Sequence, residues 1–404
     1  MQPSKALKRF TEDLSVGQSK PMGGFLKDMV AGIAMSHSAM LSDIGRTLGE
    51  DAKLITTEMR LSRNLVNANL DEAAIRERYL NAVEPFMADV VVALDFSEIR
   101  KDYAEKQEWL CDIWDNSKKE KARGYWLLNI EAIDKDGHHF PLWLEPFSQD
   151  APGYESQAHV VKHGLQQVSP HVGKACVWVL DRGFDGANYI AMLEEAKLIY
   201  CIRQVGKRTI ATEDGQQGST AAIAEAMPTP HTGRWQNKDK GRESPISFSY
   251  GSALVTFPKD GKQRRLIVVR RGNIKPMMLL TNSLSDSPAS VLRAIIAYLK
   301  RWGIEEGTRL VKQIFELENV RAMSFAGIRR LTLFASLSYG FLCLFAKRVG
   351  KAAINSVLRL YKSFGDTPHF IYYQLAKAVS MELFRGGHEG SPGSISGACK
   401  SLAS

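Results

Sequence analysis

Two aspartates each follow a continuous apolar run, and carboxylates placed in this way can hold a metal ion. Asp95 ends the run Val-Val-Val-Ala-Leu-Asp, and Asp181 ends the run Val-Trp-Val-Leu-Asp. Such runs predict buried strands, and functional side chains gather where the strands of an α/β sheet end. Two carboxylates in a dry setting repel each other unless a cation such as Mg²⁺ neutralises them. An aspartate after a strand is also a common cap or turn residue, so the pair alone leaves both interpretations open.

A third carboxylate, Glu305, belongs to a segment with helical periodicity. At about 100° per residue, four side chains share one stripe of a helix. They are Tyr298, Arg301, Glu305 and Lys312. The opposite side of a helix over 298–312 is apolar and is expected to pack on the sheet, whereas Gly303 and Gly307 could break the helix. A polar stripe of this kind is also the usual pattern of a solvent-exposed face.

The elements that must position these residues alternate between strands and helices. The predicted strands are 89–95, 126–133, 140–146, 175–180 and 198–203, and the predicted helices are 155–168 and 187–196. This order predicts the α/β class, with a mixed sheet of ribonuclease-H-like type. Residues 206–245 are rich in Gly, Gln, Thr, Lys and Arg and are expected to form a loop. Further strands are predicted at 246–257, 265–270 and 277–281, and helices follow Ser285.

The Tyr-x₂-Arg-x₃-Glu-x₆-Lys pattern that begins at Tyr298 resembles the signature of IS-four-type insertion-sequence DDE transposases, relatives of the Tn-five and Tn-ten enzymes. Asp181-Arg-Gly-Phe resembles the second-aspartate motif of that family. Asp95-Phe-Ser resembles the first, which often has Thr where Ser97 stands. The resemblance covers roughly residues 24–350, and it implies a ribonuclease-H-like fold interrupted by a β-rich insertion.

The resemblance also implies roles for individual residues. It implies a catalytic triad of Asp95, Asp181 and Glu305 that binds two Mg²⁺ ions, with Mn²⁺ as a substitute, for in-line displacement at phosphorus. It implies that Arg301 and Lys312 contact transposon-end phosphates beside Tyr298. Arg182, within the second motif, and Trp302, by stacking on bases, are further predicted DNA contacts. Trp302 fits packing equally well.

Three short predicted helices near the N-terminus cover residues 24–35, 41–48 and 58–66. Helices of this length suit a helix-turn-helix, whose last helix would enter a major groove with Arg60, Arg63 and Asn64. A generic three-helix bundle gives the same pattern.

Charge is distributed unevenly along this basic chain, whose formal net charge is +9. Residues 81–202 carry a net charge of −8, and residues 203–275 carry +8. An acidic block suits a cation site, and a basic block suits a phosphate backbone, although surface charge is often uneven. The basic block fits a DNA-tracking surface and includes Arg264, Arg265, Arg270 and Arg271 around one predicted strand. Strand alternation places Arg265 and Arg271 on one face and Arg264 and Arg270 on the other, so the four cannot all face one duplex, and basic residues on an insertion also serve solubility.

Several other classes of protein lack support in the sequence. The five cysteines form no close pair, which argues against a disulfide framework or a CxxC zinc site. There is no Walker motif, GxGxxG or nucleophile elbow. The apolar stretch 331–346 is short for a membrane span and predicts a buried helix, so no membrane partner is expected. The tail from Gly386 is small and polar and is expected to be disordered.

The resemblance implies a DNA transposase that acts on the terminal inverted repeats of an insertion sequence and on target DNA, and that moves the element by cut-and-paste. The predicted domains are 1–85 (helical, DNA-binding), 86–205 (core, first part), 206–284 (basic insertion), 285–350 (core, second part) and 351–404 (C-terminal helices and tail). Coupled cutting of two ends predicts a homodimer, and the bacterial cytoplasm, near the nucleoid, is the expected location. The alternatives are a catalytically silent DNA-binding derivative and a ribonuclease-H-like nuclease without integration activity.

Overall fold

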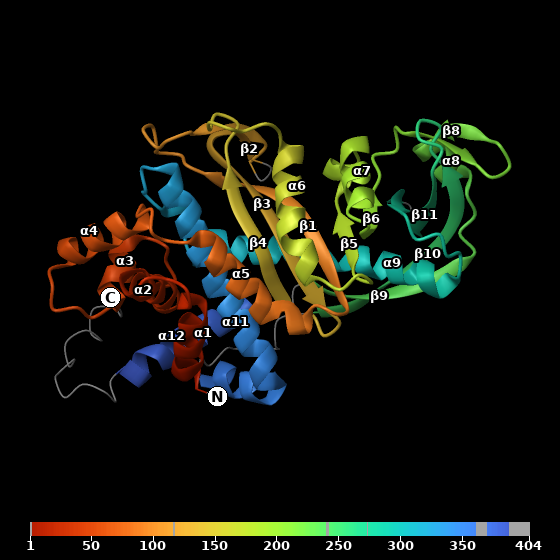
Figure 1. Ribbon diagram of the computed structural model, residues 1–404. Coiled ribbons are helices and arrows are strands. Elements are labelled where there is room, and N and C mark those ends of the chain that lie inside the picture. The colour runs from red at the N-terminus through yellow and green to blue at the C-terminus, as the bar shows by residue number, and fades with distance from the viewer. Residues whose placement is uncertain (1, 116–117, 240–241, 273, 361–369, 388–404) are drawn as a thin grey trace.

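The computed structural model describes residues 2–115, 118–239, 242–272, 274–360 and 370–387. Within them one mixed sheet runs through the molecule, and helices from both ends of the chain gather at one end of the sheet (Figure 1). The strands are β1 (Val90–Arg100), β2 (Cys111–Asp115), β3 (Glu120–Asp134), β4 (His139–Phe147), β5 (Val177–Leu180), β6 (Ile199–Arg203), β7 (Thr209–Thr212), β8 (Gln217–Ser219), β9 (His231–Asp239), β10 (Arg242–Thr256), β11 (Gln263–Arg271) and β12 (Ile274–Thr281). Their order is β2-β3-β1-β5-β6-β12-β11-β10-β7-β8, with β4 paired to β3 and β9 paired to β10.

The α-helices of the described residues lie at both ends of the chain and between the strands. They are α1 (Pro3–Ser15), α2 (Lys20–Ser36), α3 (Leu41–Thr47), α4 (Leu54–Leu65), α5 (Glu72–Val83), α6 (Gln157–Val168), α7 (Ala187–Glu195), α8 (Thr220–Ala226), α9 (Pro288–Lys300), α10 (Gly303–Arg309), α11 (Phe325–Leu360) and α12 (Tyr372–Gly387). The mixed α/β class that the sequence pattern predicts is confirmed.

The central strands β1 and β5 are parallel neighbours that separate two hydrophobic clusters. Leu94 and Leu180 pack in a cluster that includes side chains of α6 and α7. Ala93 and Val179, one residue earlier in each strand, pack instead with side chains of α9. Because side chains alternate along a strand, the apolar runs predicted from the sequence are buried on both faces of the sheet.

The inserted region 206–284 joins the same sheet, since β12 pairs antiparallel with β6. The strands predicted within it at 246–257, 265–270 and 277–281 are confirmed as β10, β11 and β12. The prediction of a loop over 206–245 is wrong, because β7, β8, α8 and β9 lie there. β9 has the polar sequence HTGRWQNKD and is held by backbone pairing with β10, which leaves little hydrophobic pattern to detect.

The N-terminal helices pack against the C-terminal helices. α2 contacts both α11 and α12, and α1 contacts α12. Their buried side chains belong to the same hydrophobic cluster as those of the sheet. The three predicted short helices correspond to α2, α3 and α4, but α4 begins at Leu54, earlier than predicted.

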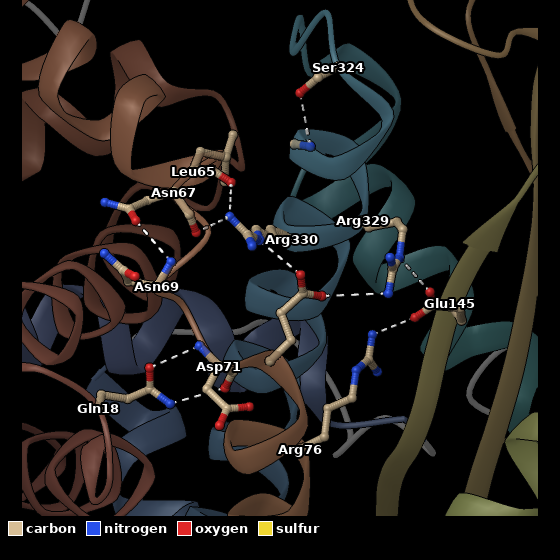
Figure 2. A network of polar contacts seen from close by, with 12 residues as sticks. Gln18, Leu65, Asn67, Asn69, Asp71, Arg76, Glu145, Ser324, Arg329 and Arg330 are labelled. Atoms are coloured by element: carbon tan, nitrogen blue, oxygen red, sulfur yellow. Dashed lines mark hydrogen bonds and ion pairs between the residues drawn. The ribbon is translucent and has the colours of Figure 1, made fainter. Parts of the chain in front are cut away.

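A buried arginine connects α11 to the end of α4 and the start of α5 (Figure 2). Arg330 donates from Nη1 to the carbonyl oxygens of Leu65 at 2.9 Å and Asn67 at 2.8 Å, and from Nε to Glu72 at 2.8 Å. On β4, Glu145 accepts from neighbouring arginines of α5 and α11. Charged contacts therefore connect the N-terminal helices to α11 and to strand β4, in addition to apolar packing.

α11 is the apolar helix that the sequence predicts. By length and composition its segment Phe325–Gly350 could cross a membrane, but its most apolar window is 94% buried within the described fold. This burial is typical of the core helix of a globular protein. The predicted disorder of the tail falls almost wholly on residues 388–404, which lie outside the described residues.

Candidate active site

Asp95 and Asp181 lie on one face of the sheet, where β1 and β5 stop pairing. The last parallel pair is Leu94 with Leu180, and the next residue of each segment is the aspartate. By strand alternation both aspartates point to the face that α9 covers. The prediction that Asp95 ends its strand is wrong, because β1 continues to Arg100 as a partner of β3.

Asp181 is oriented by a buried tyrosine of α9. The hydroxyl of Tyr298 donates a hydrogen bond of 3.1 Å to Oδ1 of Asp181, and Tyr298 is only 2% exposed. Next to Asp95, the ring of Phe96 stacks on Phe184 of the 3₁₀ turn η3 (Arg182–Phe184), with centroids 4.9 Å apart. This stack fixes one aspartate-bearing segment against the other.

Glu305 lies on α10, which is a separate short helix. α9 ends at Lys300, α10 begins at Gly303, and a π-helical turn, η4 (Leu310–Ile314), follows. The predicted helix over 298–312 is therefore interrupted, and the interruption comes directly before Gly303, one of the two glycines expected to allow a break. Arg301 lies in the turn between α9 and α10, still four residues before Glu305.

Arg301 lies between two of the carboxylates. Its Nη1 is 3.2 Å from Oδ2 of Asp95, and its Nη2 is 3.1 Å from Oε1 of Glu305. The Arg301 side chain is 6% exposed, whereas that of Glu305 is 45% exposed. The guanidinium thus neutralises carboxylates from two distant parts of the chain, and its planar group suits such paired contacts.

The electrostatics of these groups depend on one another. Burial, together with the charges of Glu305 and Asp181, raises the pKa of Asp95 to about 6 against the opposing effect of Arg301. Burial acts to lower the pKa of Arg301, but Asp95 and the other nearby anionic groups raise it overall. Burial and the charge of Asp181 raise the pKa of Tyr298 to about 12, so its hydroxyl keeps its proton at neutral pH.

The three carboxylates line one cleft of about 1510 Å³. Cationic side chains line the same cleft, namely Arg100, Lys101, Lys106, Lys118, Arg182, Arg301, Arg309, Lys312 and Arg321. Positive side chains around a group of carboxylates suit an anionic ligand whose reacting part approaches a cation site.

The other predicted DNA contacts near the triad differ in their surroundings. Lys312 lines the cleft, and its Nζ is 3.1 Å from Glu98 and 3.2 Å from Glu318. Arg182 is exposed and also lines the cleft. Trp302 is 67% exposed but does not line the cleft. Tyr298 and Arg301 contact carboxylates of the triad. Their contact with DNA stays a prediction.

The predicted recognition residues lie on α4. Arg60 is paired with Asp28 at 2.9 Å and with Glu50 at 2.5 Å. Arg63 is exposed, and Asn64 is partly buried. A phosphate would have to displace the carboxylates from Arg60, whereas Arg63 is accessible as it stands.

The predicted row of DNA-tracking arginines around β11 is not a surface feature. Arg264 is 1% exposed and pairs with Glu194 and Asp260, and Arg265 is 7% exposed. Arg270 donates to backbone carbonyl oxygens near the end of α8. The prediction that these three residues track DNA is wrong, because Arg264 and Arg265 are buried on opposite faces of the strand and Arg270 is held by backbone carbonyl oxygens.

The triad has the right donors for a divalent cation. Three carboxylates supply hard oxygen ligands, which Mg²⁺ and Mn²⁺ prefer. Among the described residues no three His, Cys, Asp or Glu side chains are grouped closely enough to hold a metal ion. Instead, the Arg301 guanidinium lies between Asp95 and Glu305, so the cluster already accommodates one positive group. The donor chemistry of the three carboxylates thus fits a divalent cation, whereas their present arrangement is that of a cluster around Arg301.

Residues that follow β1 along the chain also line the cleft, and the sequence pattern did not predict this. Lys101 donates to the carbonyl oxygens of Leu317, Glu318 and Val320 and is 4% exposed. Tyr103, which lines the cleft, is fully exposed. Basic residues at 100, 101 and 106 were a usable signal, but the net negative charge of residues 81–202 concealed it.

Together the fold and the cleft define an α/β protein with an acidic site suited to chemistry on a polyanion. Residues 87–341 match the family described as Transposase DDE domain, and the chain belongs to this family. No curated protein matches the sequence.

Among solved structures, the chain is similar to the piggyBac transposase in a cryo-EM synaptic complex with hairpin DNA. The identity is 10%, the match covers 96% of this chain and 78% of that chain, and the TM-score is 0.45. At this TM-score the likeness does not establish a shared fold, and the family assignment stands on the sequence.

Proposed function

We propose that this protein is an IS-four-type DDE transposase that binds the terminal inverted repeats of its insertion sequence and moves the element by cut-and-paste. The main observation behind this proposal is that Asp95, Asp181 and Glu305, far apart in sequence, line one cleft. Two residues of the Tyr-Arg-Glu-Lys pattern, Tyr298 and Arg301, contact these carboxylates directly. Membership of the transposase family supports the same conclusion.

In the proposed reaction Asp95, Asp181 and Glu305 would hold the divalent cations. The chemistry supplied by such cations would be activation of the attacking hydroxyl group and stabilisation of the leaving oxygen. Arg301 exchanges its carboxylate partners for phosphate oxygens, because its planar guanidinium fits either partner in the same way. Tyr298 keeps its proton and holds Asp181 in one orientation.

The wider organisation follows from this proposal. Residues 86–205 and 285–350 form a ribonuclease-H-like catalytic core, 206–284 is its insertion, and 351–404 is a C-terminal region. Residues 1–85 bind the element's end through α4, where Arg63 is exposed. Two ends need two active sites, so the working form is a homodimer on paired ends, acting on target DNA in the bacterial cytoplasm at the nucleoid.

The test is a cleavage assay on a plasmid that carries the repeats flanking the gene. Asp95→Asn, Asp181→Asn and Glu305→Gln should each abolish Mg²⁺-dependent cleavage and leave mobility-shift binding of the repeats unchanged. Glu306→Gln is the matched control, because Glu306 pairs with Arg309 and does not line the cleft. It should cleave like the wild type.

Retained cleavage in Glu305→Gln would show that the triad is wrongly assigned. A wild-type protein that binds the repeats but never cuts them would favour the silent DNA-binding alternative. Cutting without joining to target DNA would favour a nuclease.

A further inference from the structure

Three polar side chains beneath α10 are almost completely buried. Asn129 and Glu131 lie two residues apart on β3, and His139 lies on β4. Their exposures are 2%, 0% and 2%. We call Asn129, Glu131 and His139 the β3–β4 polar cluster. Buried polar groups are costly unless they are paired, so this cluster needs an explanation that packing alone does not give.

The cluster is connected to α11 and α12 by hydrogen bonds. Nδ1 of His139 is 2.5 Å from Oε1 of Glu131, and the hydroxyl of Tyr339 donates to the same oxygen at 3.0 Å. The backbone N–H of His139 donates to the hydroxyl of Tyr372 at 3.0 Å. The second oxygen of Glu131, Oε2, has no partner among the described residues.

The two glycines of α10 lie directly against this cluster. A Cβ at Gly303 would overlap the ring of His139, and a Cβ at Gly307 would overlap Oε2 of Glu131. Residues four apart share one face of a helix. The same face therefore rests on Glu131 and His139 at a depth that only glycine permits.

The catalytic carboxylate lies on the opposite face of α10. Glu305 is two residues from each glycine, about 200° around the helix, and it lines the cleft. Asn129 adds a second connection, since its Nδ2 donates to Oγ1 of Thr308 at 2.9 Å. Asn129 is also the residue of β3 that pairs with Asp95 of β1. Strand β3 therefore contacts both the helix that carries Glu305 and the strand that carries Asp95.

We propose that all three residues of the β3–β4 polar cluster, Asn129, Glu131 and His139, are positioning residues for Glu305. They set the distance of α10 from the sheet and thereby place the Glu305 carboxylate in the cleft that Asp95 and Asp181 also line. The inference rests on the proposed function, but its primary test measures cation binding without DNA. Some residues orient a metal ligand without binding the metal themselves. Substitution of such a residue typically changes metal affinity tenfold to a hundredfold.

The test measures Mn²⁺ binding to full-length protein by electron paramagnetic resonance. Gly307→Ala should push α10 outward and weaken Mn²⁺ binding about tenfold or more, with mobility-shift binding of the repeats unchanged. Gly24→Ala is the matched control, because Gly24 lies in α2 with open space where its Cβ would go, and it should bind Mn²⁺ like the wild type.

A compensating change separates positioning from general damage. Glu131→Asp shortens the carboxylate by one methylene, so Gly307→Ala combined with Glu131→Asp should bind Mn²⁺ more tightly than Gly307→Ala alone. If Gly307→Ala fails to fold, Thr308→Val serves instead, since it removes the Asn129 hydrogen bond at nearly constant volume. Thr308→Val should weaken Mn²⁺ binding several-fold.

Wild-type Mn²⁺ affinity in folded Gly307→Ala would overturn the inference, as would a double variant no better than the single one. If Gly307→Ala does not fold, unchanged Mn²⁺ affinity in Thr308→Val overturns it. These outcomes leave the proposed function intact. The proposed function fails separately if the wild type neither binds Mn²⁺ through the triad nor cuts the repeats.

Discussion

The guanidinium of Arg301 lies 3.2 Å from the carboxylate of Asp95, although the two residues are separated by most of the catalytic region. The same guanidinium contacts Glu305, so one buried cation joins two of the three proposed metal ligands. An arginine in this position suits two functions. It neutralises the carboxylates of Asp95 and Glu305, and under the proposed function it would become available to phosphate once cations bind.

Removing this cation should destabilise the fold. Arg301→Ala leaves the half-buried Asp95 beside Asp181 and Glu305 with no compensating charge, which costs about 1–3 kcal/mol of unfolding free energy at pH 8. Urea denaturation in the presence of a chelator measures the change. Arg309→Ala is the control, because Arg309 is 50% exposed and pairs only at the surface, and it should change stability by less than about 0.5 kcal/mol. Equal effects of the two substitutions would contradict this role of Arg301.

The buried lysine beside the cleft predicts a specific pH dependence. Burial lowers the pKa of Lys101 to about 8, below its ordinary value of 10.5. The unfolded chain therefore binds more protons between these values, and this residue's contribution to stability rises with pH across that window. The stability of the wild type relative to Lys101→Met should increase by about 1–3 kcal/mol between pH 8 and pH 10. Urea titrations at several pH values measure it, and parallel curves would refute the shift.

The contacts of Arg330 predict that it is a major link between the N-terminal helices and α11. Arg330→Met should cost about 2–4 kcal/mol, because it leaves the carbonyl oxygens of Leu65 and Asn67 and the carboxylate of Glu72 without their donor. Its neighbour Arg329 is 40% exposed, so Arg329→Met should cost less. Thermal unfolding compares the two, and a larger loss for Arg329→Met would contradict the assignment.

The arginines of β11 should divide into structural and surface groups. Arg264→Met should lower the unfolding free energy by about 2–4 kcal/mol, since Glu194 and Asp260 would lose a buried partner. Arg271→Ala, at an exposed position, should change stability by less than about 0.5 kcal/mol. Thermal denaturation at low and high salt distinguishes them. A stable Arg264→Met with weaker DNA binding would restore the interpretation of these arginines as a DNA track.

The comparison of sequence and structure shows where local pattern is informative. The apolar runs before Asp95 and Asp181 predict buried strands, because such runs are buried on both faces of a parallel pair. The polar strand β9 has no such pattern and was missed. Parallel strand ends that meet at one edge of a sheet predict that Asp95 and Asp181 converge, whereas Glu305 was assigned only from the resemblance to the transposase family.

The break between α9 and α10 could not be predicted from periodicity. Glu305 keeps its angular relation to Arg301 through the break, so the stripe of side chains persists. Glu131 and His139, far away in sequence, occupy the space that a Cβ at Gly307 or Gly303 would need. The local sequence shows the two glycines, but it does not show that Glu131 and His139 pack against them.

The most direct test of the central claim is the position of bound Mn²⁺, measured by anomalous diffraction from crystals of the protein with the terminal repeat. The account predicts Mn²⁺ in the cleft with carboxylate oxygens of Asp95, Asp181 and Glu305 all among its ligands, and Arg301 moved away from at least one of them. Mn²⁺ bound elsewhere, or bound in the cleft without one of these three side chains, would contradict it.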